Sequence, residues 1–113
     1  MSLSLEKIKS LQKNFDRHHS IGEKSFYVDI NESNIHELEH LMVCLLGELG
    51  EFANILKKVT RGDFSLEEVK GNLDEELVDA FIYLIKISNQ FSVDLEAGYI
   101  NKLEKNKKRF SDL

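Results

Sequence analysis

An all-α bundle of four to five helices is the fold that this sequence predicts. The chain has 113 residues with no proline and only six glycines, so few residues interrupt helices. Apolar side chains recur at three- and four-residue steps in several segments, which is the period of an amphipathic helix. Hydrophobic residues make up 42% of the chain, enough for one core. We therefore expect a single domain that spans residues 1–113.

The first helix is expected from about residue 3 to residue 18. Its apolar side chains fall on one face; they are Leu5, Ile8, Leu11 and Phe15. Residues 20–33 are polar and aperiodic, which indicates a loop. The short apolar run FYVDI within this loop either pairs as a strand or covers another part of the molecule.

The second helix is expected to begin near Asn34, because Glu37 follows three residues later as in a capping box. Arg61-Gly62-Asp63 should end it. The third helix has its own capping box, Ser65 with Glu68, and is expected to reach about residue 89, with a break or bend at residues 71–72.

The fourth helix is expected from Asp94, a suitable N-cap, to about Phe110. One segment of the third helix, LVDAFIYLIKI at residues 77–87, is apolar around most of its circumference. Such a helix is buried on several sides. In a bundle this small we expect dimerisation to provide that burial.

Charge and cysteine content narrow the classes of function. The net charge of −5 argues against a general nucleic-acid or anionic-membrane surface, since both require a basic face. Cys44 is the only cysteine, so no intrachain disulfide forms, and a reducing, cytoplasmic setting is expected. The N-terminus lacks the apolar region of a signal peptide, and the apolar segment at 77–87 is too short to span a bilayer.

Two pairs of carboxylates stand in apolar surroundings on consecutive helices. Glu48 and Glu51 are three apart in LLGELGEFANIL, and Glu76 and Asp79 are three apart in DEELVDAFIYLI. Residues three apart share a helix face. Helices joined by a short connection pack antiparallel as neighbours, so the two pairs are expected to face each other.

Four converging carboxylates repel one another unless a cation lies among them. Ligands that are all oxygen suit a hard divalent ion, Mg²⁺ or Mn²⁺. Mg²⁺ held by few protein ligands keeps waters and takes up phosphate oxygens. The pattern therefore points to a nucleotide or another phosphorylated substrate.

The same residues carry a family resemblance. GELGEFANILKK (47–58), DEELVDAFIYLIKI (74–87) and VDLEAGYINKLEKNKKRF (93–110) together resemble the MazG-like all-α nucleoside triphosphate pyrophosphohydrolases, which include the dimeric dUTPases and the dCTP pyrophosphatases. The resemblance covers roughly residues 35–110, and residues 1–33 match only as one leading helix.

This resemblance implies Mg²⁺-dependent cleavage of an NTP or dNTP to the monophosphate and pyrophosphate, as in the cleaning of a nucleotide pool. It also implies a homodimer or a dimer of dimers. Glu48, Glu51, Glu76 and Asp79 would be the metal ligands and catalytic residues. Which residue orients the attacking water stays open between these glutamates and the neighbouring Glu75.

A basic face on the last helix is a candidate for binding the triphosphate. Lys102, Asn106 and Arg109 are spaced at i, i+4 and i+7, so they share a face. Cations near a helix C-terminus are also common without any ligand. Lys57, Lys58 and Lys86 are weaker candidates, since solvated lysines at helix margins explain them.

Two other interpretations of the function stay open. HELEH at 36–40 matches the zinc-peptidase pattern H-E-x-x-H, but no histidine follows His40 to supply a third ligand. The second is an inactive relative that binds nucleotide or metal without turnover. His18 and His19 either line a nucleobase pocket together with Phe15, Phe26 and Tyr27 or simply suit the dipole at the end of the first helix. For the three aromatic residues the alternative is core packing.

Overall fold

The structure, a computed structural model, describes residues 2–111, and four α-helices dominate it. The helices are α1 (Leu5–Arg17), α2 (His36–Thr60), α3 (Leu66–Gln90) and α4 (Leu95–Phe110). Two short strands, β1 (Ser20–Ile21) and β2 (Lys24–Ser25), pair antiparallel, and a 3-10 turn, η1 (Glu32–Asn34), precedes α2. The all-α class is confirmed. No helix among residues 2–111 is long and apolar enough to cross a membrane.

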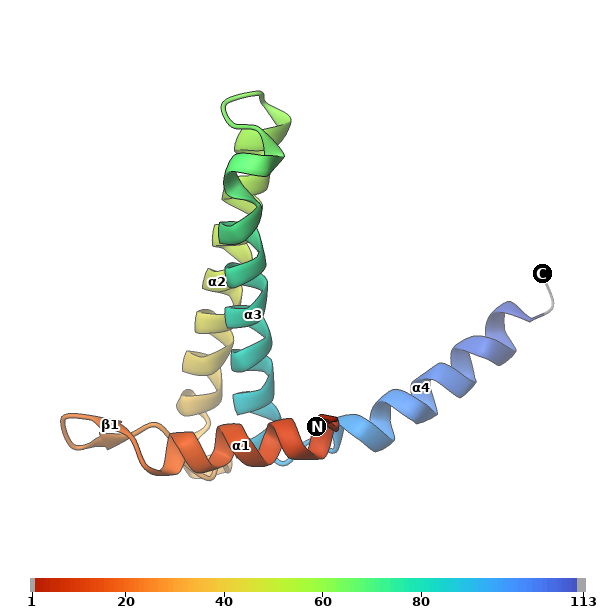
Figure 1. The fold of residues 1–113 in the computed structure, drawn as a ribbon. Helices are drawn as coiled ribbons and strands as arrows, with labels where there is room; N and C mark the ends of the chain where they lie inside the picture. Colours follow the sequence, from red (N-terminus) through yellow and green to blue (C-terminus); the bar gives the residue numbers. More distant parts are fainter. Residues whose placement is uncertain (1, 112–113) are drawn as a thin grey trace.

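A long antiparallel hairpin of α2 and α3 forms the body of the molecule (Figure 1). Each of these helices has 25 residues, which corresponds to about 37 Å at 1.5 Å per residue. α1 crosses the base of the hairpin, and α4 leads away from it on the other side (Figure 1). A closed bundle is therefore not completed within one chain.

The hairpin turn has the form that the sequence predicts. α2 ends at Thr60, and Gly62 follows with φ +89°, a conformation that favours glycine. Ser65 caps α3, since its hydroxyl accepts from the Glu68 amide while the Glu68 carboxylate accepts from the Ser65 amide. The hydrogen bond from the Ser65 backbone amide holds the pKa of the Glu68 carboxyl below its ordinary value. α3 continues through residues 71–72 without a break.

α2 begins at His36, close to the expected start near residue 34, but the predicted N-cap and capping box are wrong. Its N-cap is Ile35, which offers no side-chain hydrogen bond. The capping box lies one element earlier, where Asn31 and Asn34 bond each other across η1. Glu37 instead forms an ion pair with Lys24 of β2, at 3.2 Å between Nζ and Oε2. Asparagine is equally suited to turns and to caps, so spacing alone did not separate the two.

The FYVDI segment covers the end of α3 and is not a ladder strand. The side-chain amide of Gln90 donates through Nε2 to the Phe26 carbonyl at 3.0 Å. Its Oε1 atom accepts from the Val28 backbone amide at 3.2 Å. The Ile30 amide donates to the Gln90 carbonyl at 2.9 Å. Gln90 is buried, so these bonds satisfy its polar groups away from water.

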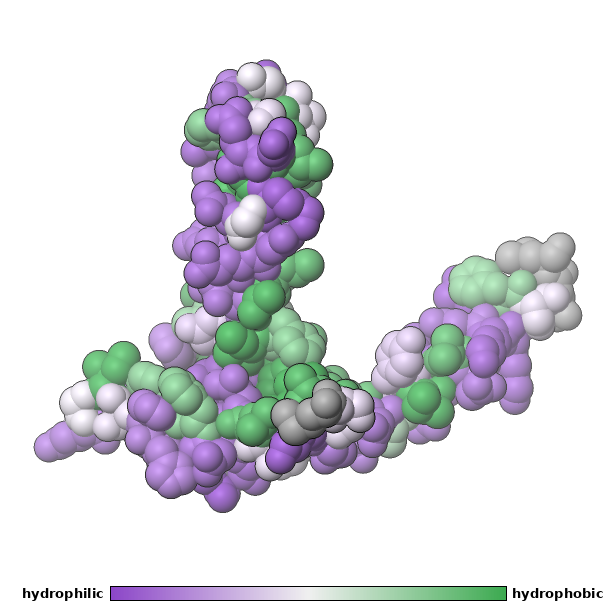
Figure 2. Space-filling view, in the orientation of Figure 1, coloured by the Kyte–Doolittle hydropathy of each residue, from purple (hydrophilic) through white to green (hydrophobic). Residues whose placement is uncertain are grey.

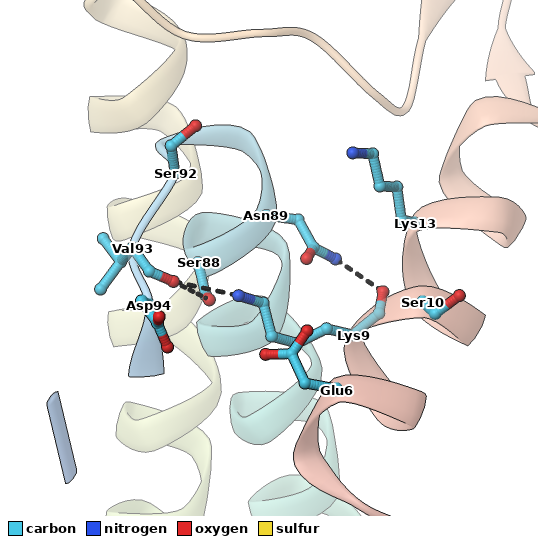
Figure 3. A pocket seen from close by; sticks show the side chains of 9 residues that line it. All are labelled: Glu6, Lys9, Ser10, Lys13, Ser88, Asn89, Ser92, Val93 and Asp94. Carbon is cyan, nitrogen blue, oxygen red and sulfur yellow. Dashed lines mark hydrogen bonds between the residues drawn. The ribbon is translucent and has the colours of Figure 1, made fainter. Parts of the chain in front are cut away.

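A polar cavity marks the junction of α1, α3 and the start of α4 (Figure 3). Lys9 Nζ and the Ser88 hydroxyl both donate to the Val93 carbonyl, at 3.0 and 2.9 Å. The Asn89 amide donates to the Lys9 carbonyl at 2.9 Å. Asp94 then caps α4 as expected. These bonds fix where α4 begins.

The apolar core lies between α2 and α3 and is small; its buried members are Leu41, Val69, Leu73, Ala80 and Ile85. Many large apolar side chains stay exposed on the hairpin and on α4 (Figure 2). They include Val43, Leu46, Leu77, Val78, Phe81, Tyr99 and Ile100. The segment at 77–87 is thus only partly buried by its own chain.

Candidate active site

A cluster of carboxylates lies between the two helices of the hairpin. Glu48 comes from α2, and Glu76 and Asp79 come from α3. One oxygen from each of the three lies within 4.8 Å of the others, and all three side chains are half-buried. The antiparallel packing of α2 on α3 therefore brings the two predicted acidic pairs together.

Glu76 is the most constrained of these acids. Its Oε2 atom is shielded from water and has no hydrogen-bond partner among the described residues. A hydrogen bond shared with Glu48 is the largest cause that raises the pKa of Glu76 to about 7; contact with Glu51 and the loss of solvent add to it. Glu51, the fourth predicted acid, lies at the exposed edge of the cluster.

The donor set fits a hard divalent cation. All the facing atoms are carboxylate oxygens, the ligand type that Mg²⁺ and Mn²⁺ prefer. A buried carboxylate oxygen without a donor, as at Glu76, is costly unless a cation or a proton satisfies it. Glu48, Glu76 and Asp79 are therefore the residues able to hold such an ion, with Glu51 beside them.

A cavity of about 450 Å³ adjoins the acidic cluster between α1 and α3. Glu48 and Asp79 belong to its wall; the other lining residues are Gln12, Phe15, Phe26, Ile82, Tyr83 and Lys86. Burial is the largest cause that raises the pKa of Tyr83, and the nearby Cys44 and acids add to it. The volume lies in the range of small-molecule sites.

Aromatic rings stack along the side of this cavity. The Phe15 and His19 rings are stacked with centroids 4.0 Å apart, and His19 and Phe26 follow at 6.2 Å. Phe15 and Phe26 both line the cavity beside the acidic cluster. Tyr27 lies elsewhere, with the Arg17 guanidinium 4.8 Å from its ring centroid. His18 Nδ1 lies 2.7 Å from the Asn14 carbonyl oxygen on the same helix.

The chain has relatives among curated proteins. dCTP pyrophosphatase 1 of Homo sapiens is 30% identical over 90 residues, which cover 75% of this chain and 52% of that protein. dCTP pyrophosphatase 1 of Rattus norvegicus is 27% identical over 89 residues, with the same coverage. The Gene 37 protein of Mycobacterium phage L5 is 33% identical over 81 residues, which cover 67% of this chain and 71% of that protein. The chain belongs to one family with this phage protein.

The chain spans about half the length of the dCTP pyrophosphatases that it matches. Their names support a relationship between this member of the Gene 37 family and nucleoside triphosphate pyrophosphatases. No family model matches the chain. No solved structure is significantly similar to it.

The basic face of this family member lies apart from the carboxylates. Lys102, Asn106 and Arg109 are on α4, which leads away from the hairpin (Figure 1). None of the three lines the cavity beside the acidic cluster. One chain therefore brings together the four acids and two of the aromatic residues, but not the basic face.

The zinc-peptidase pattern finds no support in the described part of the chain. His36 lies beside Glu37, and His40 Nε2 lies 3.7 Å from Cys44 Sγ. Within residues 2–111, the acidic cluster is the only group of three or more side chains of metal-binding type that converges. HELEH thus lacks the third ligand that a zinc site requires.

A buried ion pair beside the cavity is the feature that sequence reasoning missed. Asp16 is fully buried, and Lys86 Nζ lies 2.9 Å from its Oδ1 atom. The expectation that Lys86 is a solvated lysine is wrong, since only 13% of its side chain is exposed. One signal was available, because Asp16 lies eleven residues, about three helical turns, after Leu5 and therefore on the same side of α1 as that apolar residue.

Proposed function

We propose that this protein is a Mg²⁺-dependent nucleoside triphosphate pyrophosphohydrolase that cleaves an NTP or dNTP to the monophosphate and pyrophosphate. One observation carries the proposal: carboxylates from two helices converge on one point at the wall of an aromatic-lined cavity. The names of the dCTP pyrophosphatase relatives support it. Mn²⁺ is the alternative ion, because it prefers the same oxygen ligands.

Glu48, Glu76 and Asp79 would hold the cation, and Glu51 would complete the set from the edge of the cluster. When bound, Mg²⁺ neutralises charge on the phosphate oxygens as the phosphoanhydride bond breaks. Glu51 is also exposed to solvent, which makes it the first candidate to orient the attacking water. Glu75, exposed next to Glu76 on α3, is the second.

The nucleoside would occupy the adjoining cavity. Phe15, Phe26 and Tyr83 supply the flat apolar surfaces against which a base can stack. Glu48 and Asp79 belong to the same wall, so a nucleotide in the cavity would extend its phosphates towards the acids. Because two relatives are named dCTP pyrophosphatase, dCTP is the first substrate to test.

The triphosphate would meet the basic face of a second copy. α4 carries Lys102, Asn106 and Arg109 away from the hairpin of its own chain (Figure 1), and none of the three lines the cavity beside its acids. A homodimer or a dimer of dimers would cover the exposed apolar side chains of the hairpin and bring one copy's α4 to the other's acids. The resulting enzyme would act in the cytoplasm without binding nucleic acid or membrane.

Pyrophosphate release tests the proposal. The purified chain would be incubated with each common NTP and dNTP, first with Mg²⁺ and then with EDTA. We expect release from one or a few nucleotides, lost with EDTA and lost in Glu76→Gln. Release from none of them, together with nucleotide-induced thermal stabilisation, would indicate instead an inactive relative that binds nucleotide.

A further inference from the structure

Resting on the proposed function, we propose that the buried ion pair of Asp16 with Lys86 positions the α1 wall of the cavity and thereby sets nucleotide affinity, while the metal site is independent of it. Asp16, which is fully buried, is the positioning residue, because it acts through side chains of the cavity wall and not on the nucleotide itself. Loss of the pair is expected to weaken nucleotide binding and to leave cation binding unchanged.

The attachment of α1 to the hairpin is largely polar. The structure describes all of α1, and Asp16 is its only buried residue. The apolar side chains of α1 are half-buried or exposed; at the cavity end, Leu11 and Phe15 are 51% and 49% exposed. Asp16 Oδ1 accepts from Lys86 Nζ at 2.9 Å, and about two turns earlier the Lys9 carbonyl accepts a side-chain hydrogen bond from α3. The ion pair is therefore the attachment at the cavity end of α1.

Lys86 connects this attachment to other parts of the cavity wall. Its ammonium group lies 5.2 Å from the Phe26 ring centroid and 6.0 Å from that of Tyr83, within the range of cation–π contacts. Asp16 Oδ1 also accepts from Gln12 Nε2 at 3.0 Å. Gln12, Phe26, Tyr83 and Lys86 all line the cavity. One ion pair thus holds side chains from α1, from α3 and from the segment after β2 in a single arrangement.

The acids of the metal site are held in a different way. Glu48 comes from α2, and Glu76 and Asp79 come from α3, so the packing of the hairpin places them. α1 crosses only the base of that hairpin (Figure 1). A change in the orientation of α1 should therefore alter the nucleoside side of the cavity and spare the acids.

Stability alone gives no reason for an ion pair at this position. A buried ion pair contributes little net stability, because the desolvation of two charges offsets their attraction, and apolar side chains of similar volume often replace it without loss. An ion pair that shares its acceptor with a second donor instead specifies one orientation of α1. If that orientation falls to about a tenth of the population, the apparent nucleotide affinity falls about tenfold.

Binding of deoxynucleoside monophosphates tests the inference without turnover. The full chain with Mg²⁺ is titrated calorimetrically with dAMP, dCMP, dGMP and dTMP, and the tightest of the four becomes the probe. Asp16→Leu/Lys86→Met removes both charges, so its melting temperature should equal or exceed that of the wild type. Its affinity for the probe should nevertheless fall by roughly tenfold, whereas the rise in melting temperature with Mg²⁺ should match the wild type. In pyrophosphate release, KM should rise by a similar factor and kcat should change little.

Asp16→Ala distinguishes positioning from direct contact of Lys86 with the nucleotide. This variant keeps the ammonium group in the cavity wall and removes only the buried carboxylate, so it should also weaken probe binding by roughly tenfold. If Asp16→Ala binds the probe as the wild type does, Asp16 does not position the wall and the inference is overturned. Unchanged affinity in a stable Asp16→Leu/Lys86→Met variant would overturn it as well.

A matched control lies on α3. Lys70 and Asp74 form an exposed ion pair, so Asp74→Leu/Lys70→Met makes the same chemical change away from the cavity and should keep the wild-type affinity. A wild-type chain that binds none of the four monophosphates would overturn the inference, since its cavity would then hold no nucleoside. Probe binding that depends on Asp16, without pyrophosphate release from any nucleotide, would support the positioning role and contradict the hydrolase.

Discussion

Glu76 shows at the scale of one residue why this site requires a cation or a proton. Its carboxylate lies beside Glu48 and Glu51, and one of its oxygens is shielded from water. The hydrogen bond shared with Glu48, together with contact with Glu51 and the loss of solvent, favours the protonated form, so the pKa of Glu76 rises to about 7 from its ordinary value of 4.5. Without metal, the folded chain therefore binds a proton at Glu76 that the unfolded chain releases.

This proton makes stability depend on pH in the metal-free protein. Because the pKa is higher in the folded state, the stabilisation by the proton is complete below about 4.5 and is lost as the pH rises through about 7. In EDTA, the melting temperature of the wild type should fall relative to that of Glu76→Gln between roughly pH 5 and pH 8. Parallel curves for the two proteins would contradict the coupling of these acids. Mg²⁺ should raise the wild-type melting temperature at pH 8 by binding the folded state.

Two further substitutions separate the function of the cluster from its stability. Glu51→Gln or Asp79→Asn should lower kcat by roughly a hundredfold or more, because each removes a proposed ligand of the cation that neutralises charge on the reacting phosphates. Each should leave the metal-free protein as stable or more stable, since each also removes a repelling charge. Pyrophosphate release and thermal unfolding measure the two effects. Normal turnover in either variant would refute the assignment of these ligands.

At the scale of elements, local signals predicted α3 and α4 well. The Ser65–Glu68 capping box and the Asp94 N-cap both begin helices as expected, because each uses atoms within one turn of the chain. The N-cap of α2 was not predictable in this way, since Glu37 pairs with Lys24 of the β-hairpin rather than with its own helix end. The role of the FYVDI segment likewise depends on Gln90, distant in sequence.

The candidate site likewise contains residues that local sequence spacing predicts and residues that it does not. The four acids were predictable, because a three-residue spacing fixes a shared face on any helix and a short turn makes the two helices neighbours. The Asp16–Lys86 pair was not, because it joins residues 70 positions apart whose contact depends on how α1 crosses the hairpin. Lys86 in isolation resembles any solvated lysine.

The cap of α3 gives a prediction at this scale. Ser65→Ala should destabilise the protein by about 1 kcal/mol, because it leaves the Glu68 amide without its hydroxyl acceptor. Ser10→Ala, at an exposed position of α1, serves as the control and should change stability little. Chemical denaturation measures both. Equal free energies of unfolding for the two variants would show that the capping box does not stabilise the turn.

The whole molecule is more open than a compact domain of its length. Its radius of gyration is 17.4 Å, whereas a compact domain of this length has about 13 Å. Leu46 and Leu77, at the middle of the hairpin, are both 54% exposed. Apolar surface of this extent on a small protein marks an interaction site. A second copy would cover it and bring a basic face to each acidic cluster.

Complementation between two inactive variants tests this arrangement. Glu51→Gln damages the acids, and Lys102→Ala/Arg109→Ala damages the basic face, so each should lack activity alone. In a hybrid dimer, the intact acids of one chain meet the intact α4 of the other. Random pairing of equal amounts makes about half of the dimers hybrids with one intact site of two, so about a quarter of wild-type activity should return.

The control is a mixture of Glu51→Gln with Glu76→Gln, in which both chains have damaged acids and no pairing creates an intact site. Its activity should stay at the level of either variant alone. Hybrid formation is verified by capturing one chain through an affinity tag and detecting the other. If hybrids form and no activity returns, the basic face of α4 does not act on the partner's acids. Recovery in the test mixture alone would place Lys102 and Arg109 in a site shared between two chains.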